Sequence, residues 1–310
     1  MPKWTHKHLL DLQEMSRDDI ALILETAKSF KEVSQREVKK VPALRGKTVA
    51  LLFAEPSTRT RMSFELAAKR LSADTLSIQA AASSLVKGET LLDTALNIQA
   101  MNVDLVVVRH SASGAPQIIA NGTQMAVVNA GDGCRSHPTQ GLLDIFTMNE
   151  RIGKLEGIKV AIVGDILHSR VARSNIAGLT RMGAHVVVCG PGTLIPMGIE
   201  AMGVQVTTRI AEALKDADVV MALRMQKERQ QEAYLPTVSE YVREFCITPD
   251  RLRYAKPNAI VMHPGPTNRG VEIAAEVADG PQSVILDQVT NGIAVRMAVL
   301  YLLLGRKAKV

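Results

Sequence analysis

The sequence predicts an α/β protein with two doubly wound parallel-sheet domains joined by helices, and three observations support this prediction. Short apolar runs recur along the 310 residues, and stretches of helical period separate several of them. The runs lack polar alternation, which is typical of parallel strands buried on both faces. The chain is long enough for two domains, and repeated strand–helix units favour parallel sheets.

The apolar runs define the expected strands, and the segments between them define helices. Strands are expected at residues 49–53, 105–108, 126–128, 160–163, 186–189, 219–223, 260–262 and 284–286. Ser16 and Asp19 form a capping-box pattern at the start of a helix. The apolar face of that helix is expected to hold Ile20, Ile23, Leu24 and Ala27. The same spacing recurs in Phe64, Ala67, Ala68 and Leu71.

The expected domains are residues 1–140 and residues 141–288, and a final segment covers residues 289–310. Residues 140–158 read as a connecting helix that ends in a glycine-containing turn. The final segment is helical in pattern, and the pattern alone leaves open which domain it packs on.

Composition excludes several classes of function. The net charge of +6 comes from 37 basic and 31 acidic residues spread along the chain, so nucleic acid is not an expected partner. Three widely spaced cysteines without a CxxC pair argue against a disulfide framework or a zinc site and suit a reducing cytosol. The N-terminus lacks a signal-peptide pattern, and the apolar run at residues 297–304 is too short to span a membrane. We therefore expect a cytoplasmic protein.

The most distinctive polar segment is PSTRTR at residues 56–61, between an expected strand and an expected helix. A helix N-terminus presents unpaired N–H groups and the positive end of the helix dipole, which together bind phosphate. Hydroxyl groups add donors, and arginine adds a planar fork that matches a phosphate. One such cluster alone is often only a capped helix with solvated arginines.

Two further polar clusters follow expected strands. Arg109 and His110 come at the end of one strand, and the segment 131–140, with His137 and Gln140, follows the next. Ligands of parallel sheets bind beyond the carboxyl ends of strands. The three clusters together therefore predict an anion site. The sequence VAIVGD at residues 160–165 lacks two glycines of the dinucleotide pattern GxGxxG, so no nucleotide cofactor is expected.

Four ordered motifs resemble those of the aspartate/ornithine carbamoyltransferase family, and the resemblance covers essentially the whole chain. The motifs are FAEPSTRTR at residues 53–61, HPTQ at 137–140, RMQKER at 224–229 and HPGP at 263–266. The ornithine branch usually has lysine at the position of Glu55 and HPCQ in place of HPTQ. The resemblance therefore favours the aspartate branch, and it implies that the last helix packs on the first domain.

The resemblance implies transfer of the carbamoyl group of carbamoyl phosphate to the α-amine of L-aspartate, in de novo pyrimidine biosynthesis. The products are N-carbamoyl-L-aspartate and phosphate, and neither a metal nor a cofactor is expected. The nucleophile is the substrate's own amine. Two carboxylates of aspartate need cations, and the second half of the chain supplies Arg170 and Arg224. Ornithine carries a second ammonium group, which does not suit a site with this excess of cationic side chains.

The resemblance also implies residue roles, with the first domain binding carbamoyl phosphate and the second binding aspartate. Carbamoyl phosphate is expected to contact Ser57, Thr58, Arg59, Thr60, Arg109, His137 and Gln140; among these, the catalytic residues are expected to be Arg59, Thr60, Arg109 and His137. Aspartate is expected to contact Lys87, Arg170, Arg224, Gln226, Gly265 and Pro266. Domain closure is expected to pair Glu55 with Arg170 and Arg229.

The family also implies a homotrimer whose active sites are shared between neighbouring subunits. Lys87, together with Ser83 or Ser84, is expected to reach the neighbour's site, and the varying loop length leaves the choice of serine open. A regulatory chain or a dihydroorotase is a candidate partner. The alternatives are a catalytically silent scaffold of the same fold and a carbamoyltransferase for another amino acid. His168, Ser169 and Thr267 stand at positions where the family varies.

Overall fold

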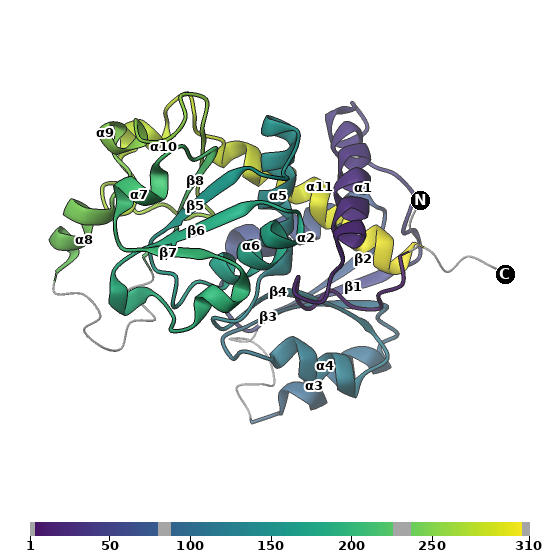
Figure 1. Cartoon of the computed structure of the whole chain (residues 1–310). Helices are drawn as coiled ribbons and strands as arrows, with labels where there is room; N and C mark the ends of the chain where they lie inside the picture. The colour runs from purple at the N-terminus through teal and green to yellow at the C-terminus, as the bar shows by residue number, and fades with distance from the viewer. Residues whose placement is uncertain (1–3, 80–87, 226–236, 306–310) are drawn as a thin grey trace. The chain divides into compact units, whose positions relative to one another are not determined.

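The computed structural model describes residues 4–79, 88–225 and 237–305, which divide into two compact units (Figure 1). The first unit consists of Met1–Leu143 and Thr290–Val310, and the second consists of Asp144–Val289. Each unit contains a parallel sheet with helices on both faces. The predicted fold class is therefore confirmed.

The first unit has a sheet in the order β2-β1-β3-β4, and all neighbouring strands are parallel. The strands are β1 (Thr48–Phe53), β2 (Asp74–Gln79), β3 (Leu105–His110) and β4 (Ala126–Asp132). One face of the sheet packs on α3 (Leu91–Ala100) and α4 (Ala115–Gly122). In Figure 1, α1 (Arg17–Gln35) and α11 (Ile285–Leu304) lie on the opposite side of this sheet.

The helices predicted for the first unit are present. Ser16 and Asp19 make the predicted capping box at the start of α1, and the four predicted apolar residues of this helix are buried. Phe64, Ala67 and Ala68 are buried in α2 (Thr58–Arg70). The ring of Phe30 in α1 meets that of Tyr301 in α11 edge to face, and the Arg296 guanidinium lies over the Phe64 ring. The terminal helix thus completes the core of this unit.

The second unit has a sheet in the order β7-β6-β5-β8-β9, also parallel between neighbours. Its strands are β5 (Lys159–Val163), β6 (His185–Cys189), β7 (Gln205–Thr207), β8 (Val219–Ala222) and β9 (Ile260–Met262). One face packs on α7 (Ile210–Leu214), α8 (Val238–Phe245) and α10 (Ala275–Ala278). The described residues of this unit also form α6 (Arg170–Arg181), α9 (Pro249–Leu252) and the short 3₁₀ helices Gly192–Leu194 and Ile199–Met202. Helix α5 (Pro138–Ile152) begins in the first unit and ends in the second.

Both sheets have a switch point, where the chain reverses its direction of winding. In the first unit, β1 connects to β2 on one side, and the chain then crosses to β3 on the other side. In the second unit, β5 connects toward β6 and β7, and β8 lies on the other side of β5. Ligands of doubly wound sheets bind at such points, outside the carboxyl ends of the strands. Each unit therefore has one favoured binding edge.

One predicted strand is wrong and two strands were not predicted. Residues 284–286 do not form a strand, because α11 starts at Ile285. A run of three apolar residues fits either a strand or the buried side of a helix. The unpredicted strands β2 and β7 are edge strands with polar sequences. Among the described helices, none combines the length and the apolar character needed to cross a membrane.

Candidate functional site

The start of α2 has the features of an anion site. Ser57 is the N-cap residue in an extended conformation, and within the described chain its hydroxyl does not cap the helix. The first turn of α2 contains no acidic residue, and Thr58 and Arg59 are exposed. The N–H groups of this turn and the helix dipole therefore favour an anionic ligand. This agrees with the sequence-based placement of PSTRTR at a helix start.

Arg109 contacts two other predicted site residues at the switch point of the first sheet. It lies on β3, in register with Phe53 at the end of β1. Its Nη2 donates to Glu55 Oε1 at 2.9 Å, and its Nη1 lies 3.5 Å from Thr60 Oγ1. Nη1 also donates to the carbonyl oxygen of Ala130 at 3.3 Å. The Arg109 guanidinium is thus held by Ala130 on β4 and by Glu55, which follows β1. It also lies close to Thr60 in the first turn of α2.

His137 and Gln140 lie at the start of α5, after β4. Both side chains are buried, with 4% and 9% of their residue surface exposed. The backbone N–H of Gln140 donates to the carbonyl oxygen of His137 at 2.9 Å, which fixes the first turn of the helix. Pro138 is the first helical residue, a position where the missing N–H of proline carries no cost. The structure therefore holds both predicted side chains in a rigid helix start.

A buried carboxylate that the sequence reasoning did not single out supports this segment. Asp132, the last residue of β4, accepts hydrogen bonds from the backbone of Gly114 at 2.7 Å and Ser136 at 3.2 Å. It also accepts from the Asn129 side chain at 2.8 Å. Asn129 and Asp132 are fully buried. Their polar side chains at the end of an apolar strand were a visible signal, but their bonding partners lie in segments that only the fold brings together.

In the second unit, Arg170 follows β5. The chain turns at Gly164, whose φ of +136° favours glycine. Asp165 Oδ1 accepts from the backbone N–H of His168 at 3.1 Å, and the Ser169 hydroxyl caps α6 by accepting from Ala172. Arg170 is the first residue of α6, with 5% of its surface exposed. Its position is therefore fixed by the turn and by the helix cap.

Two other predicted segments end neighbouring strands of the same sheet. Arg224 follows β8, which pairs with β5, and the turn at residues 263–266 follows β9, which pairs with β8. The Gly265–Pro266 peptide bond is cis, and Gly265 has a φ of +65°. Arg170 and Arg224 thus flank the switch point of the second sheet, and the turn with Gly265 and Pro266 lies one strand further.

Five predicted residues lie outside the described part of the chain. They are Ser83, Ser84, Lys87, Gln226 and Arg229. Of the predicted residues that the structure describes, Arg109 contacts both Glu55 and Thr60, and the remainder occupy the carboxyl edges of the two sheets.

The cysteines are not arranged for nucleophilic catalysis. Cys134, Cys189 and Cys246 are not joined in disulfides. Burial is the main reason that the pKa of the Cys189 thiol is raised to about 12, so this side chain stays protonated near neutral pH. Among the described residues, histidine, cysteine and acidic side chains form no group of three that could hold a metal ion.

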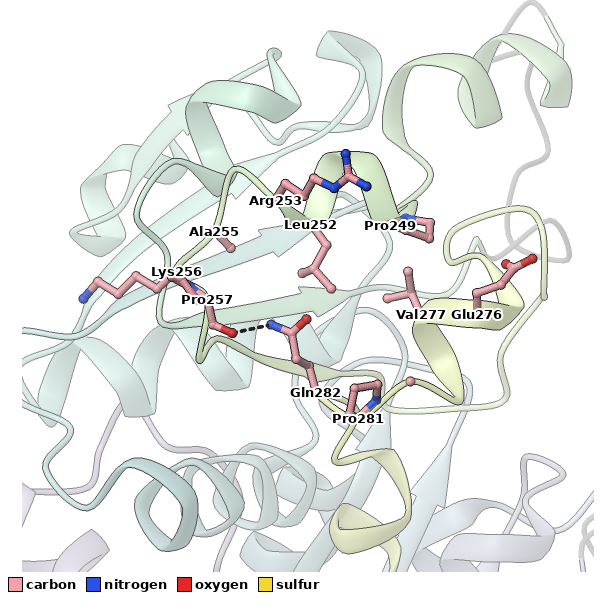
Figure 2. Close-up of a pocket in the computed structure, with 11 residues that line it drawn as sticks. Pro249, Leu252, Arg253, Ala255, Lys256, Pro257, Glu276, Val277, Pro281 and Gln282 are labelled. Atoms are coloured by element: carbon pink, nitrogen blue, oxygen red, sulfur yellow. Dashed lines mark hydrogen bonds between the residues drawn. The ribbon is translucent and has the colours of Figure 1, made fainter.

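A pocket of about 430 Å³ in the second unit is not part of these clusters (Figure 2). Leu252 and Val277 form part of its apolar lining. The Gln282 amide donates to the carbonyl oxygens of Pro257 and Ala259, just before β9 begins. The pocket therefore lies at the amino end of β9, whereas the predicted site residues follow the carboxyl ends of strands.

Comparison with protein families matches both halves of the chain. Residues 7–150 match the carbamoyl-P binding domain of aspartate/ornithine carbamoyltransferases, and residues 156–303 match the Asp/Orn binding domain of the same family. Together these matches cover both sheets and all four sequence motifs.

Known proteins are similar over almost the whole chain. The aspartate carbamoyltransferase catalytic subunit of Syntrophotalea carbinolica is 60% identical, over 97% of this chain and 96% of the relative. That of Syntrophobacter fumaroxidans is also 60% identical, over 97% and 98%. Among solved structures, aspartate transcarbamoylase from Trypanosoma cruzi in complex with carbamoyl phosphate and aspartate has a TM-score of 0.87, at 30% identity over 98% of this chain and 99% of that one.

A solved ornithine carbamoyltransferase is structurally as similar. The enzyme from Pyrococcus furiosus has a TM-score of 0.87 and 33% identity, and the match covers 99% of each chain. The fold alone therefore does not separate the two branches. Two domain matches and relatives at 60% identity show that this chain belongs to the aspartate/ornithine carbamoyltransferase family.

Proposed function

We propose that this chain transfers the carbamoyl group of carbamoyl phosphate to the α-amine of L-aspartate, in pyrimidine biosynthesis. The observation that carries the proposal is the placement of arginines at the switch points of both sheets. Arg109 stands in the first unit, beside the anion-binding start of α2, and Arg170 and Arg224 stand in the second. Relatives at 56–60% identity are named aspartate carbamoyltransferase catalytic subunits, which supports aspartate as the acceptor.

The first unit, with residues 1–140 as its binding domain, takes carbamoyl phosphate. Ser57, Thr58, Arg59 and Thr60 hold the phosphate, and Arg59 also neutralises it as it leaves. Thr60, Arg109 and His137 donate toward the carbonyl oxygen of the carbamoyl group, and Gln140 faces the carbamoyl nitrogen. Support comes from the uncapped start of α2 and from the Arg109–Thr60 contact.

The second unit, with residues 141–288 as its binding domain, takes aspartate. Arg170 and Arg224 bind the two carboxylates, with Gln226 and Lys87 as further contacts, and the carbonyl groups of Gly265 and Pro266 orient the amine. A second ammonium, as in ornithine, would face these two arginines at close range and lose affinity. The cationic edge of this sheet therefore selects an acidic amino acid.

The chemistry needs no nucleophile from the protein. The amine attacks the carbonyl carbon, and the resulting tetrahedral state carries negative charge on oxygen, which preorganised donors stabilise. The C–O bond to phosphate then breaks, and the leaving phosphate takes the amine proton. His137 acts mainly as a donor in this scheme. Holding the two substrates in the correct orientation supplies a further part of the rate.

Glu55 has a second role in this proposal. The structure pairs it with Arg109, and the family resemblance implies that it pairs with Arg170 and Arg229 when the domains close on both substrates. This second role explains why the carboxylate of Glu55 lies next to an anion site: it stabilises the closed form of the protein.

The proposed assembly is a cytoplasmic homotrimer with shared sites. Met62 and Leu66 are 59% and 39% exposed, and they share one face of α2, because residues four apart lie on the same side of a helix. This apolar face supports contact with another subunit. Ser83 or Ser84, together with Lys87, enters the neighbour's site in this proposal. A regulatory chain or a dihydroorotase is a further candidate partner.

Turnover with different amino acids tests the proposed function. The purified chain is incubated with carbamoyl phosphate and either aspartate or ornithine, and phosphate release and the carbamoylated product are both measured. We expect phosphate and carbamoyl aspartate in equal amounts. Turnover with ornithine but not aspartate would reject the acceptor, and no turnover with either would favour a silent scaffold.

A further inference from the structure

The turn at residues 263–266 is held by the buried side chain of its first residue. The backbone N–H of Gly265 donates to Nδ1 of His263 at 2.8 Å. A backbone N–H can only donate, so Nδ1 must carry its lone pair and the ring proton must be on Nε2. The contact therefore fixes both the tautomer of His263 and the peptide plane that enters Gly265.

The Nε2–H of His263 meets a second buried group. Glu272 Oε1 lies 3.1 Å from Nε2, and the same oxygen accepts the backbone N–H of Asn268 at 2.5 Å. The backbone of Glu272 is itself fixed, because Ile247 donates to its carbonyl oxygen at 3.0 Å. Oε1 of Glu272 therefore links the His263 side chain to the backbone of Asn268, further along the loop.

A chain of buried polar side chains connects this turn to the helix that bears Arg170. The backbone N–H of His263 donates to Gln288 Oε1 at 3.0 Å, and Gln288 Nε2 donates to Asp144 Oδ1 at 2.7 Å. Asn175, on α6, donates to the other oxygen of Asp144 at 2.7 Å. The turn and the middle of α6 therefore belong to one hydrogen-bonded framework.

A contribution to folding stability does not by itself explain why the Glu272 carboxylate is buried at this position. Glu272 is buried, and its Oε2 meets no hydrogen-bond partner among the described residues. A buried carboxylate with one unsatisfied oxygen is costly to keep in a folded protein. Buried polar side chains that contact one another in this way hold a core in one arrangement, which is what a positioning role requires.

We propose that His263 and Glu272 are positioning residues for the acceptor amine. Glu272 holds the Nε2–H tautomer of His263, and Nδ1 of His263 then holds the Gly265 amide. This sets the direction in which the turn presents the carbonyl groups of Gly265 and Pro266. The inference rests on the proposed function, in which those carbonyl groups orient the amine of aspartate.

Two substitutions of His263 separate positioning from packing. His263→Asn places an amide oxygen near the position of Nδ1 and keeps the acceptor for Gly265. His263→Gln places its amide near Nε2, which keeps the contact with Glu272 and loses that acceptor. We expect kcat with aspartate to fall about 10²-fold in the glutamine variant, the usual effect of a misplaced reactant, and far less in the asparagine variant. The KM for carbamoyl phosphate should stay unchanged in both.

The control is Asp279→Asn, which breaks the exposed ion pair between Arg269, on the same loop, and Asp279, at the end of α10, and should leave turnover unchanged. Melting temperatures are measured for all variants. Equal losses of kcat in the asparagine and glutamine variants, or no loss in either, would overturn the inference. If the unsubstituted chain makes no carbamoyl aspartate, the proposed function itself fails.

A spectroscopic measurement tests the tautomer without relying on activity. Nitrogen-15 NMR of histidine-labelled protein reports which ring nitrogen carries the proton, and the spectrum of His263→Asn assigns the signal. We expect a proton on Nε2 and none on Nδ1. A proton on Nδ1 would overturn the inference even if the enzyme is active.

Discussion

Arginine side chains at the start of α2 and at the end of β3 carry the proposed chemistry at the scale of single residues. Arg59 is exposed in the first turn of α2, and Arg109 is held by Glu55 and Ala130. Arg59 is exposed to solvent, whereas Arg109 is anchored at the edge of the sheet. The two can therefore contribute differently, Arg59 to the leaving phosphate and Arg109 to the carbonyl oxygen.

Replacing Arg59 by alanine should abolish most activity and leave the fold intact. Loss of one charged donor from a preorganised site typically costs about 10²–10³ in rate. Steady-state kinetics and circular dichroism measure the two properties. Arg45→Ala, at another exposed arginine of the same unit, is the control and should behave like the unsubstituted chain. Normal kinetics in Arg59→Ala would refute the anion site.

Replacing Glu55 by glutamine should have opposite effects on binding and turnover. The Glu55 carboxylate forms an ion pair with the Arg109 guanidinium at 2.9 Å. An incoming phosphate therefore competes with this carboxylate for the guanidinium. Its removal should tighten inorganic phosphate binding by roughly twofold to fivefold, the size of a partly exposed ion pair. It should also slow turnover, because closure loses its carboxylate. Calorimetry and kinetics measure the two effects. Glu65→Gln, which breaks a surface pair with Lys69, is the control; unchanged phosphate affinity in Glu55→Gln would contradict this account.

Sequence patterns pointed to the proposed ligand contacts more readily than to the residues that support them. Arg109 and His137 were singled out because they follow the carboxyl ends of predicted strands, where ligands of parallel sheets bind, and because the family motifs include them. Asp132 and Glu272 were not singled out, because their partners lie in segments that only the folded backbone brings together. The pairing of Glu55 with Arg109 was missed for the same reason.

Central strands and capped helices were predictable at the scale of elements, and edge strands were not. The strands β1, β3, β5, β6 and β8 are apolar on both faces because sheet neighbours and helices cover them. The edge strands β2, with sequence DTLSIQ, and β7, with sequence QVT, carry no such pattern. Their formation depends on pairing with β1 and β6.

The capping box of α1 gives a prediction for stability. Ser16 accepts from the Asp19 backbone at 3.1 Å and donates to its carboxylate at 2.6 Å. Ser16→Ala should lower the free energy of unfolding by about 1 kcal/mol at neutral pH, and Ser16→Thr should lose less. Urea unfolding measures both changes.

The cost of Ser16→Ala should also depend on pH. Burial acts to raise the pKa of Asp19, but hydrogen bonds from Ser16 and His6 hold this pKa below its ordinary value of 3.8. A lowered carboxyl pKa stabilises the fold above the ordinary value, and this contribution is lost as the pH falls through the lower, folded value. The difference between the two proteins should therefore narrow in acid. A difference that widens below pH 4 would contradict the assignment.

Shared sites give a prediction at the scale of the whole molecule. Arg59→Ala and Lys87→Ala subunits, each inactive alone, are mixed under conditions of subunit exchange. In a trimer with sites between neighbours, random mixing should restore about a quarter of the original activity, because each mixed trimer regains one intact site. Light scattering checks the mass of the assembly. Absence of any recovery in verified mixed trimers would argue against shared sites.

The most direct test of the central claim is a competition between acceptors. The purified chain receives carbon-13-labelled carbamoyl phosphate in an equimolar mixture of aspartate and ornithine, and mass spectrometry identifies the labelled products. The cationic edge formed by Arg170 and Arg224 predicts labelled carbamoyl aspartate, in an amount equal to the phosphate released. Labelled citrulline as the main product, or phosphate release without carbamoyl aspartate, would contradict the account.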